Sequence, residues 1–93
     1  MSNATTNDPP QRDPAALALR ALAATIADQR LAERFLALSG IDPLELRHSA
    51  AEPDLLAALL RFLEAHEPDL VTIAATLGVK PAALVAARRE LER

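Results

Sequence analysis

The strongest constraint on the fold is a run of leucines in the middle of the chain, in residues 54–66, with the sequence DLLAALLRFLEAH. The leucines recur at i, i+1, i+4, i+5 and i+8, which is the spacing of one broad stripe on an α-helix. They are Leu55, Leu56, Leu59, Leu60 and Leu63. Phe62 lies beside this stripe and widens it. A helix with so little polar surface has to be covered by other helices, so we predict that it lies at the centre of a small helical domain.

Prolines mark where the surrounding helices begin. Five of the seven prolines follow a residue that can start a helix, in Asp13-Pro14, Asp42-Pro43, Glu52-Pro53, Glu67-Pro68 and Lys80-Pro81. Proline is tolerated in the first turn because the N–H that it lacks has no partner there. Asp28 adds a start without proline, and Gly40 and Gly78 are predicted to end helices in the left-handed conformation. These signals predict helices near residues 14–27, 28–39, 42–50, 54–66, 68–77 and 81–91.

The pattern predicts one domain and a tail. Residues 1–12 are polar and contain two adjacent prolines, so we expect a disordered N-terminal tail, followed by a single helical domain at residues 13–93. The expected fold is all-α, a compact orthogonal bundle of five to six short helices, because each helix has only about three turns. The predicted inner faces include Leu19, Leu22 and Ile26 in the first helix and Leu31, Phe35 and Leu38 in the second.

The composition excludes several classes of function. The chain has no cysteine, so disulfides, thiol nucleophiles and cysteine-bound metals are ruled out, and a cytoplasmic location is expected. A net charge of −3 argues against nucleic acid as a partner, because phosphate binding needs a basic surplus. No apolar run approaches the roughly 18 residues of a membrane span, and no signal peptide is recognised, so no membrane partner is expected.

No residues are spaced as a catalytic centre would require. The two histidines, His48 and His66, have no third ligand at metal spacing, and the serines have no partner histidine in a nucleophile motif. With only two glycines there is no phosphate-binding loop. We therefore predict that the chain is not an enzyme and has no cofactor and no metal.

Residues 70–89 resemble a helix-turn-helix. Ala74, Gly78 and Val79 have the spacing of its buried small residue, its turn and the residue that fills the turn. DNA binding through this segment would use Lys80, Arg88, Arg89 and Arg93 as phosphate contacts. The second helix carries no residue that reads base edges before Arg88, and residues 52–69 hold five acidic residues and one basic residue. DNA binding is therefore the alternative hypothesis.

The leading hypothesis is a small interaction or regulatory module that binds an unidentified protein or a second copy of itself. Three apolar residues lie off the predicted inner faces, namely Leu17, Leu36 and Val85. Together they would form an exposed apolar patch, which is the usual mark of a partner site.

The chain also resembles a known family. The resemblance rests on the run FLALSGIDP at residues 35–43, Ala51-Glu52-Pro53, residues 55–63, and Gly78-Val79 before a final Ala-Ala-Arg-Arg. These features are similar to the DUF3572 family of short alphaproteobacterial proteins, over about residues 15–91. The resemblance implies a bacterial cytoplasmic helical domain, and it carries over no catalytic or ligand-binding residue.

Overall fold

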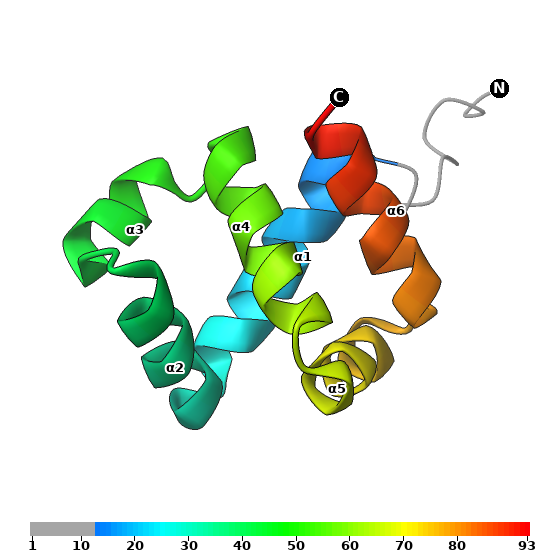
Figure 1. Ribbon diagram of the computed structural model, residues 1–93, viewed down its shortest axis with the longest axis horizontal. Helices are drawn as coiled ribbons and strands as arrows, with labels where there is room; N and C mark the ends of the chain where they lie inside the picture. The colour runs from blue at the N-terminus through cyan, green and yellow to red at the C-terminus, as the bar shows by residue number, and fades with distance from the viewer. Residues whose placement is uncertain (1–12) are drawn as a thin grey trace, which may run out of the picture.

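The computed structural model describes residues 13–93, which form six α-helices (Figure 1). They are α1 (Pro14–Ala27), α2 (Gln29–Ser39), α3 (Pro43–Ser49), α4 (Pro53–Glu64), α5 (Glu67–Leu77) and α6 (Pro81–Leu91). The all-α prediction is confirmed, and no strand occurs in the described residues. The central helix ends at Glu64, two residues before the predicted end, because His66 is the N-cap of α5. The predicted tail at residues 1–12 lies outside the described residues.

The helix ends follow the signals in the sequence. The Asp13 carboxylate accepts hydrogen bonds from the backbone N–H groups of Ala15 and Ala16, at 3.1 and 3.2 Å. Asp28 and Asp42 cap α2 and α3 in the same way. Gly40 and Gly78 end α2 and α5 with φ values of 72° and 74°. Each cap satisfies backbone groups that a helix end leaves without an intrahelical partner.

Helices α1 and α4 cross at the centre of the molecule (Figure 1). Helices α2 and α3 lie on one side of this pair, and α5 and α6 lie on the other. Both central helices pack against α2, α5 and α6 as well as against each other. All five leucines of the α4 stripe are buried, and Leu59, Leu60 and Leu63 have no exposed surface. The prediction of a buried central helix is confirmed, and α1 shares the central position.

The inner face of α1 differs from the prediction. Its buried residues are Leu17, Ala18, Ala21, Leu22 and Thr25, whereas Leu19 and Ile26 are 42% and 38% exposed. The buried face is rich in alanine, which allows neighbouring helices to approach closely. The Thr25 hydroxyl donates to the Ala21 carbonyl at 2.7 Å, so it is buried with its hydrogen bond made. Leu38 was also predicted to face inward, but it is 74% exposed in the last turn of α2.

Helices α5 and α6 form the predicted hairpin. Their axes differ in direction by 98°, and three residues join them. The Val79 N–H donates to the Ala74 carbonyl at 3.0 Å, and Ala74 and Leu84 are fully buried. Arg20 of α1 donates to the Leu77 carbonyl at 3.2 Å, which attaches the end of α5 to the central helix. No single helix in residues 13–93 is long and apolar enough to cross a membrane, although α5 and α6 together meet both criteria despite their bend.

Candidate interaction surface

The predicted patch of Leu17, Leu36 and Val85 does not form. Leu17 is 0% exposed, because it lies on the buried face of α1. Leu36 and Val85 are half-buried, and they belong to α2 and α6, which lie on opposite sides of the central pair (Figure 1). Of the three predicted residues, only Leu36 lines the groove described below.

Four of the five large apolar side chains that are exposed in residues 13–93 lie in the first half of the chain. Leu19, Ile26, Leu38 and Leu44 are 38–74% exposed and belong to α1, α2 and α3. Val71 of α5, 46% exposed, is the fifth such residue in the described part of the chain. Large exposed apolar side chains are therefore more numerous on α1, α2 and α3 than on the other described helices.

One groove lies between α1, α2 and α3 and is called here the α1–α3 groove. It has a volume of about 420 Å³, and nine of its ten lining residues are apolar. The lining residues are Leu19, Leu22, Ala23 and Ile26 of α1, Ala32 and Leu36 of α2, and Pro43, Leu46, Arg47 and Ala50 in and next to α3. Arg47 is the one charged residue, is exposed, and makes no ion pair within residues 13–93.

A second groove, the α2–α4 groove, lies on the other side of α2, with a volume of about 550 Å³. Phe35 and Phe62 are among its lining residues, with their rings edge to face and their centroids 5.3 Å apart. The Arg34 guanidinium lies 5.3 Å from the Phe62 ring centroid, a cation–π distance. The other polar residues of the lining are Ser39, Arg61 and His66.

The basic groups of the α2–α4 groove are already paired. Asp69 is 6% exposed and accepts from Arg34 at 2.8 Å, and it lies 2.9 Å from Nδ1 of His66. Burial raises the pKa of Asp69, but the hydrogen bonds from Arg34 and His66 lower it by more, so the net pKa lies below its ordinary value. Arg61 pairs with Glu92. The structure thus shows a partly buried ion pair between α2 and α5, in which Asp69 is covered and Arg34 is partly exposed.

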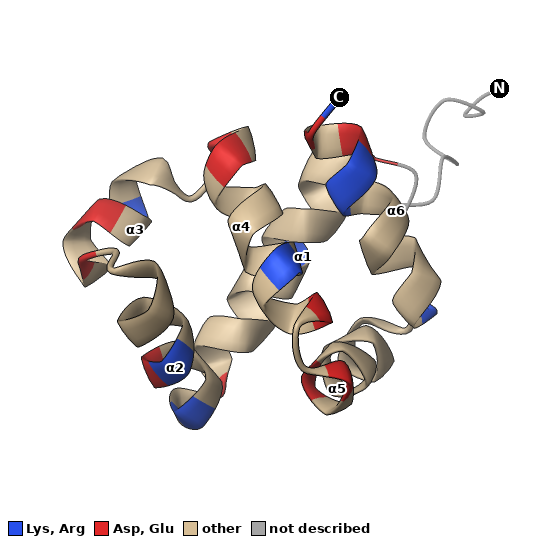
Figure 2. Ribbon diagram, in the orientation of Figure 1, with Lys and Arg blue, Asp and Glu red and all other residues tan. Residues whose placement is uncertain are grey.

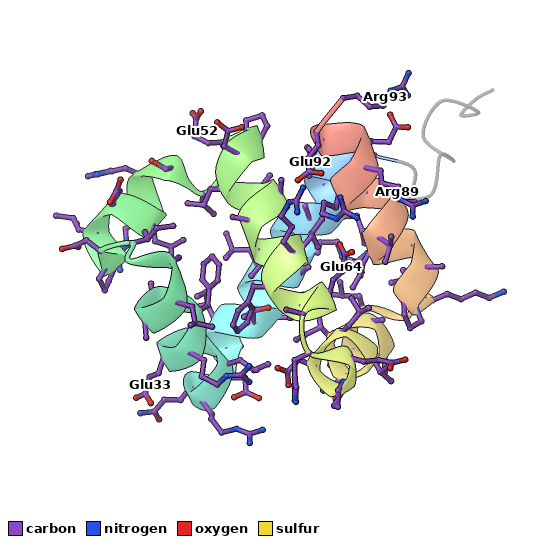
Figure 3. All side chains as sticks on the ribbon, in the orientation of Figure 1. Glu33, Glu52, Glu64, Arg89, Glu92 and Arg93 are labelled. Atoms are coloured by element: carbon purple, nitrogen blue, oxygen red, sulfur yellow. The ribbon has the colours of Figure 1, made fainter. Side chains whose placement is uncertain are left out.

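The four residues that were predicted to contact phosphate differ in exposure and in their ion pairs. Arg88 is only 17% exposed and bonds Glu64 with two nitrogens, at 2.6 and 3.2 Å, and Glu92 at 2.7 Å. These hydrogen bonds raise the pKa of Arg88 above its ordinary value. Figure 3 shows Glu64 directed from α4 toward α6, where it fixes Arg88 as a structural link. Arg88 is therefore not available to phosphate.

The remaining basic residues of the hairpin are exposed but few. Arg93 pairs with Glu90 at 3.0 Å, and Figure 3 shows Arg89 and Arg93 projecting away from the body of the molecule. Lys80 and Arg89 make no ion pair within the described part of the chain. In Figure 2 the basic residues are spread over several helices rather than gathered on one face. In residues 13–93 no group of three or more histidine, aspartate and glutamate side chains could hold a metal ion.

These features define the class of the protein: a small all-α bundle with two grooves on either side of α2, of which the α1–α3 groove is almost entirely apolar. The chain belongs to the DUF3572 family, described as a protein of unknown function, whose model matches residues 11–93. No curated protein and no solved structure matches the chain. The family resemblance in the sequence is confirmed.

Proposed function

We propose that this protein is a binding module that receives an apolar segment of a partner protein in the α1–α3 groove. The observation that carries the proposal is the composition of that groove, in which nine of ten lining residues are apolar while Leu19 and Ile26 remain exposed. Apolar surface of this kind is stabilised when a partner removes it from water.

The dimensions of the groove support a protein segment as the ligand. Its volume of about 420 Å³ lies in the range of sites that take several side chains or a small ligand. Its lining comes from α1, α2 and α3, so a segment that enters it contacts three helices. The proposal includes no catalytic step, and the absence of cysteine supports a cytoplasmic setting for the interaction.

A random peptide library, panned on three forms of the full-length chain, tests this function. The wild type is compared with the double variant Leu19→Glu/Ile26→Glu, which places two charges in the groove, and with Val71→Glu, a matched control at an exposed apolar residue of α5. Peptides that need the groove are expected to bind the wild type and the control at least about ten-fold more tightly than the double variant. If no peptide is retained in a groove-dependent way, the proposed function is wrong.

DNA binding is the second candidate, and the 98° hairpin of α5 and α6 with its three-residue turn favours it. Only Lys80 and Arg89 are exposed and without an ion pair on this hairpin, which limits the phosphate contacts that it offers. Retention on duplex DNA should then fall steeply with salt and be lost in Lys80→Ala/Arg89→Ala. Retention that is absent at low salt, or unchanged in this variant, would exclude the hairpin as a DNA-binding element.

A further inference from the structure

We propose that the occupant of the α1–α3 groove is an acidic amphipathic helix of a different protein. This helix carries apolar residues at i, i+3 or i+4, and i+7, and a carboxylate beside them that pairs with Arg47. The inference rests on the proposed function and adds the chemistry of the partner to it.

The charge of the grooves indicates an acidic partner. Acidic residues outnumber basic ones in this chain, 13 to 10, yet no acidic residue lines either groove. The charged residues that do line them are Arg34 and Arg61 in the α2–α4 groove and Arg47 in the α1–α3 groove. Arg34 and Arg61 are paired with Asp69 and Glu92, whereas Arg47 has no ion pair in the part of the chain that the structure describes. Arg47 is therefore the cation at which a carboxylate of the partner gains most.

The geometry of the groove indicates a helical partner. Leu19 and Ile26 are seven residues apart on α1, so they are separated by two turns, about 10.5 Å along the axis. An amphipathic helix presents its anchors at the same interval, and helices commonly dock in grooves between two others in this way. The small side chains of Ala23, Ala32 and Ala50 leave room in the groove for the anchors of the partner.

Within residues 13–93, a second copy of this chain does not offer an acidic helix of this kind. Of the exposed large apolar residues, Leu19 and Ile26 line the α1–α3 groove itself and Leu38 lines the α2–α4 groove. Leu44 and Val71 are the others in the described residues, and they lie singly on α3 and α5. Neither Leu44 nor Val71 belongs to an exposed apolar stripe two turns long. In the described residues Leu19 and Ile26 of α1 form such a stripe, but the one charged residue of α1 is Arg20, which offers no carboxylate to Arg47. An acidic helix with this spacing is therefore that of another protein.

Two labelled synthetic peptides test the inference. Both are 16-residue helices with leucines at i, i+4 and i+7, and they differ only in carrying glutamates or lysines beside the leucines. Binding to the full-length chain is followed by fluorescence anisotropy at about 0.15 M salt, where distant charges are largely screened. The wild type is compared with Arg47→Glu and with Arg30→Glu, a matched control at an exposed arginine of α2 that lines neither groove.

The wild type and Arg30→Glu are expected to bind the acidic peptide about five-fold more tightly than the basic peptide, and Arg47→Glu is expected to reverse the preference. The net charge of −3 favours the basic peptide in a non-specific encounter, so a preference for the acidic peptide reports on the groove.

Equal affinity for the two peptides, or a preference that Arg47→Glu leaves unchanged, would overturn the inference while the proposed function stands. If neither peptide binds but the library yields groove-dependent sequences, the acidic-helix inference is wrong and the proposed function stands. If neither peptide binds and the library yields no such sequence, both proposals are wrong. Sedimentation of the chain alone as a dimer that Leu19→Glu/Ile26→Glu dissociates would show that a second copy occupies the groove.

Discussion

The orientation of α1 can be tested with two leucines that lie two positions apart. Leu17 is 0% exposed on the packed face of the helix, and Leu19 is 42% exposed in the α1–α3 groove. The sequence predicts the opposite roles, with Leu19 inside and Leu17 outside. Replacing each of them separately with alanine therefore distinguishes the two orientations of the helix.

The expected losses follow from burial. The change to alanine removes three carbons, and at about 0.8 kcal/mol for each buried carbon this is roughly 2.4 kcal/mol for Leu17. The closed cavity left behind raises the total to about 3–4 kcal/mol. Leu19 keeps a little over half of its surface covered and opens no closed cavity, so its loss is about 1 kcal/mol. For a domain of this size, Leu17→Ala removes a large part of a total stability of roughly 5–10 kcal/mol.

Urea denaturation followed by far-UV circular dichroism measures both losses, because the described chain is helical and the sequence has no tryptophan or tyrosine. The denaturant slope should be the same in both variants, so that the midpoints report stability. At about 4–8 °C for each kcal/mol, the two melting temperatures should differ by roughly 10 °C or more. A loss in Leu19→Ala equal to or larger than that in Leu17→Ala would refute the orientation of α1.

Three further outcomes are expected from urea denaturation. Asp69→Asn should lower stability by about 1–2 kcal/mol at neutral pH. Because the folded pKa of Asp69 lies below its unfolded value, the carboxylate stabilises the fold above about pH 4 and loses this effect as the pH falls further, so the variant should approach the wild type at low pH. Gly78→Ala should cost about 1 kcal/mol through the positive φ alone, since its Cβ would meet no atom within 4 Å, and Gly78→Asn should cost less. Arg88→Met should lower the midpoint because Glu64 and Glu92 lose their shared cation, whereas the exposed Arg89→Met should leave it unchanged.

The helix boundaries and the α4 stripe could be predicted because their causes are local. Asp13, Asp28 and Asp42 cap the turns that directly follow them, and Gly78 ends the turn that directly precedes it. The α4 leucines repeat with the helical period, so they identify the buried face without knowledge of any neighbour.

The buried face of α1 could not be predicted from the sequence in the same way. Residues 17, 18, 21, 22 and 25 have the same spacing as the α4 stripe, but alanines and a threonine hold three of these places, so the larger Leu19 and Ile26 dominated the pattern. Close helix packing favours small residues, and this preference becomes visible only when the neighbours are in place.

The ion pair and the groove depend on distant parts of the chain. Arg34 and Asp69 are 35 residues apart, and nothing in the sequence around either residue indicates the other. The α1–α3 groove is lined by residues that lie between 19 and 50 in the sequence, so it becomes visible only when the three helices are placed together. Arg47 has no signal of its own in the sequence, because an arginine on a short helix is ordinarily a solvated residue.

Helix α3 buries few side chains, and this has a consequence for the local stability of the α1–α3 groove. The only buried residue of this seven-residue helix is Leu46, so little apolar contact opposes its local unfolding. The amide hydrogens of α3 should exchange with solvent sooner than those of α4. The part of the α1–α3 groove that α3 lines is then less rigid than the part that α1 lines. If the proposed partner binds in this groove, it has to order α3 on arrival, so its residence time would depend on the rigidity of α3 as well as on the fit of its side chains.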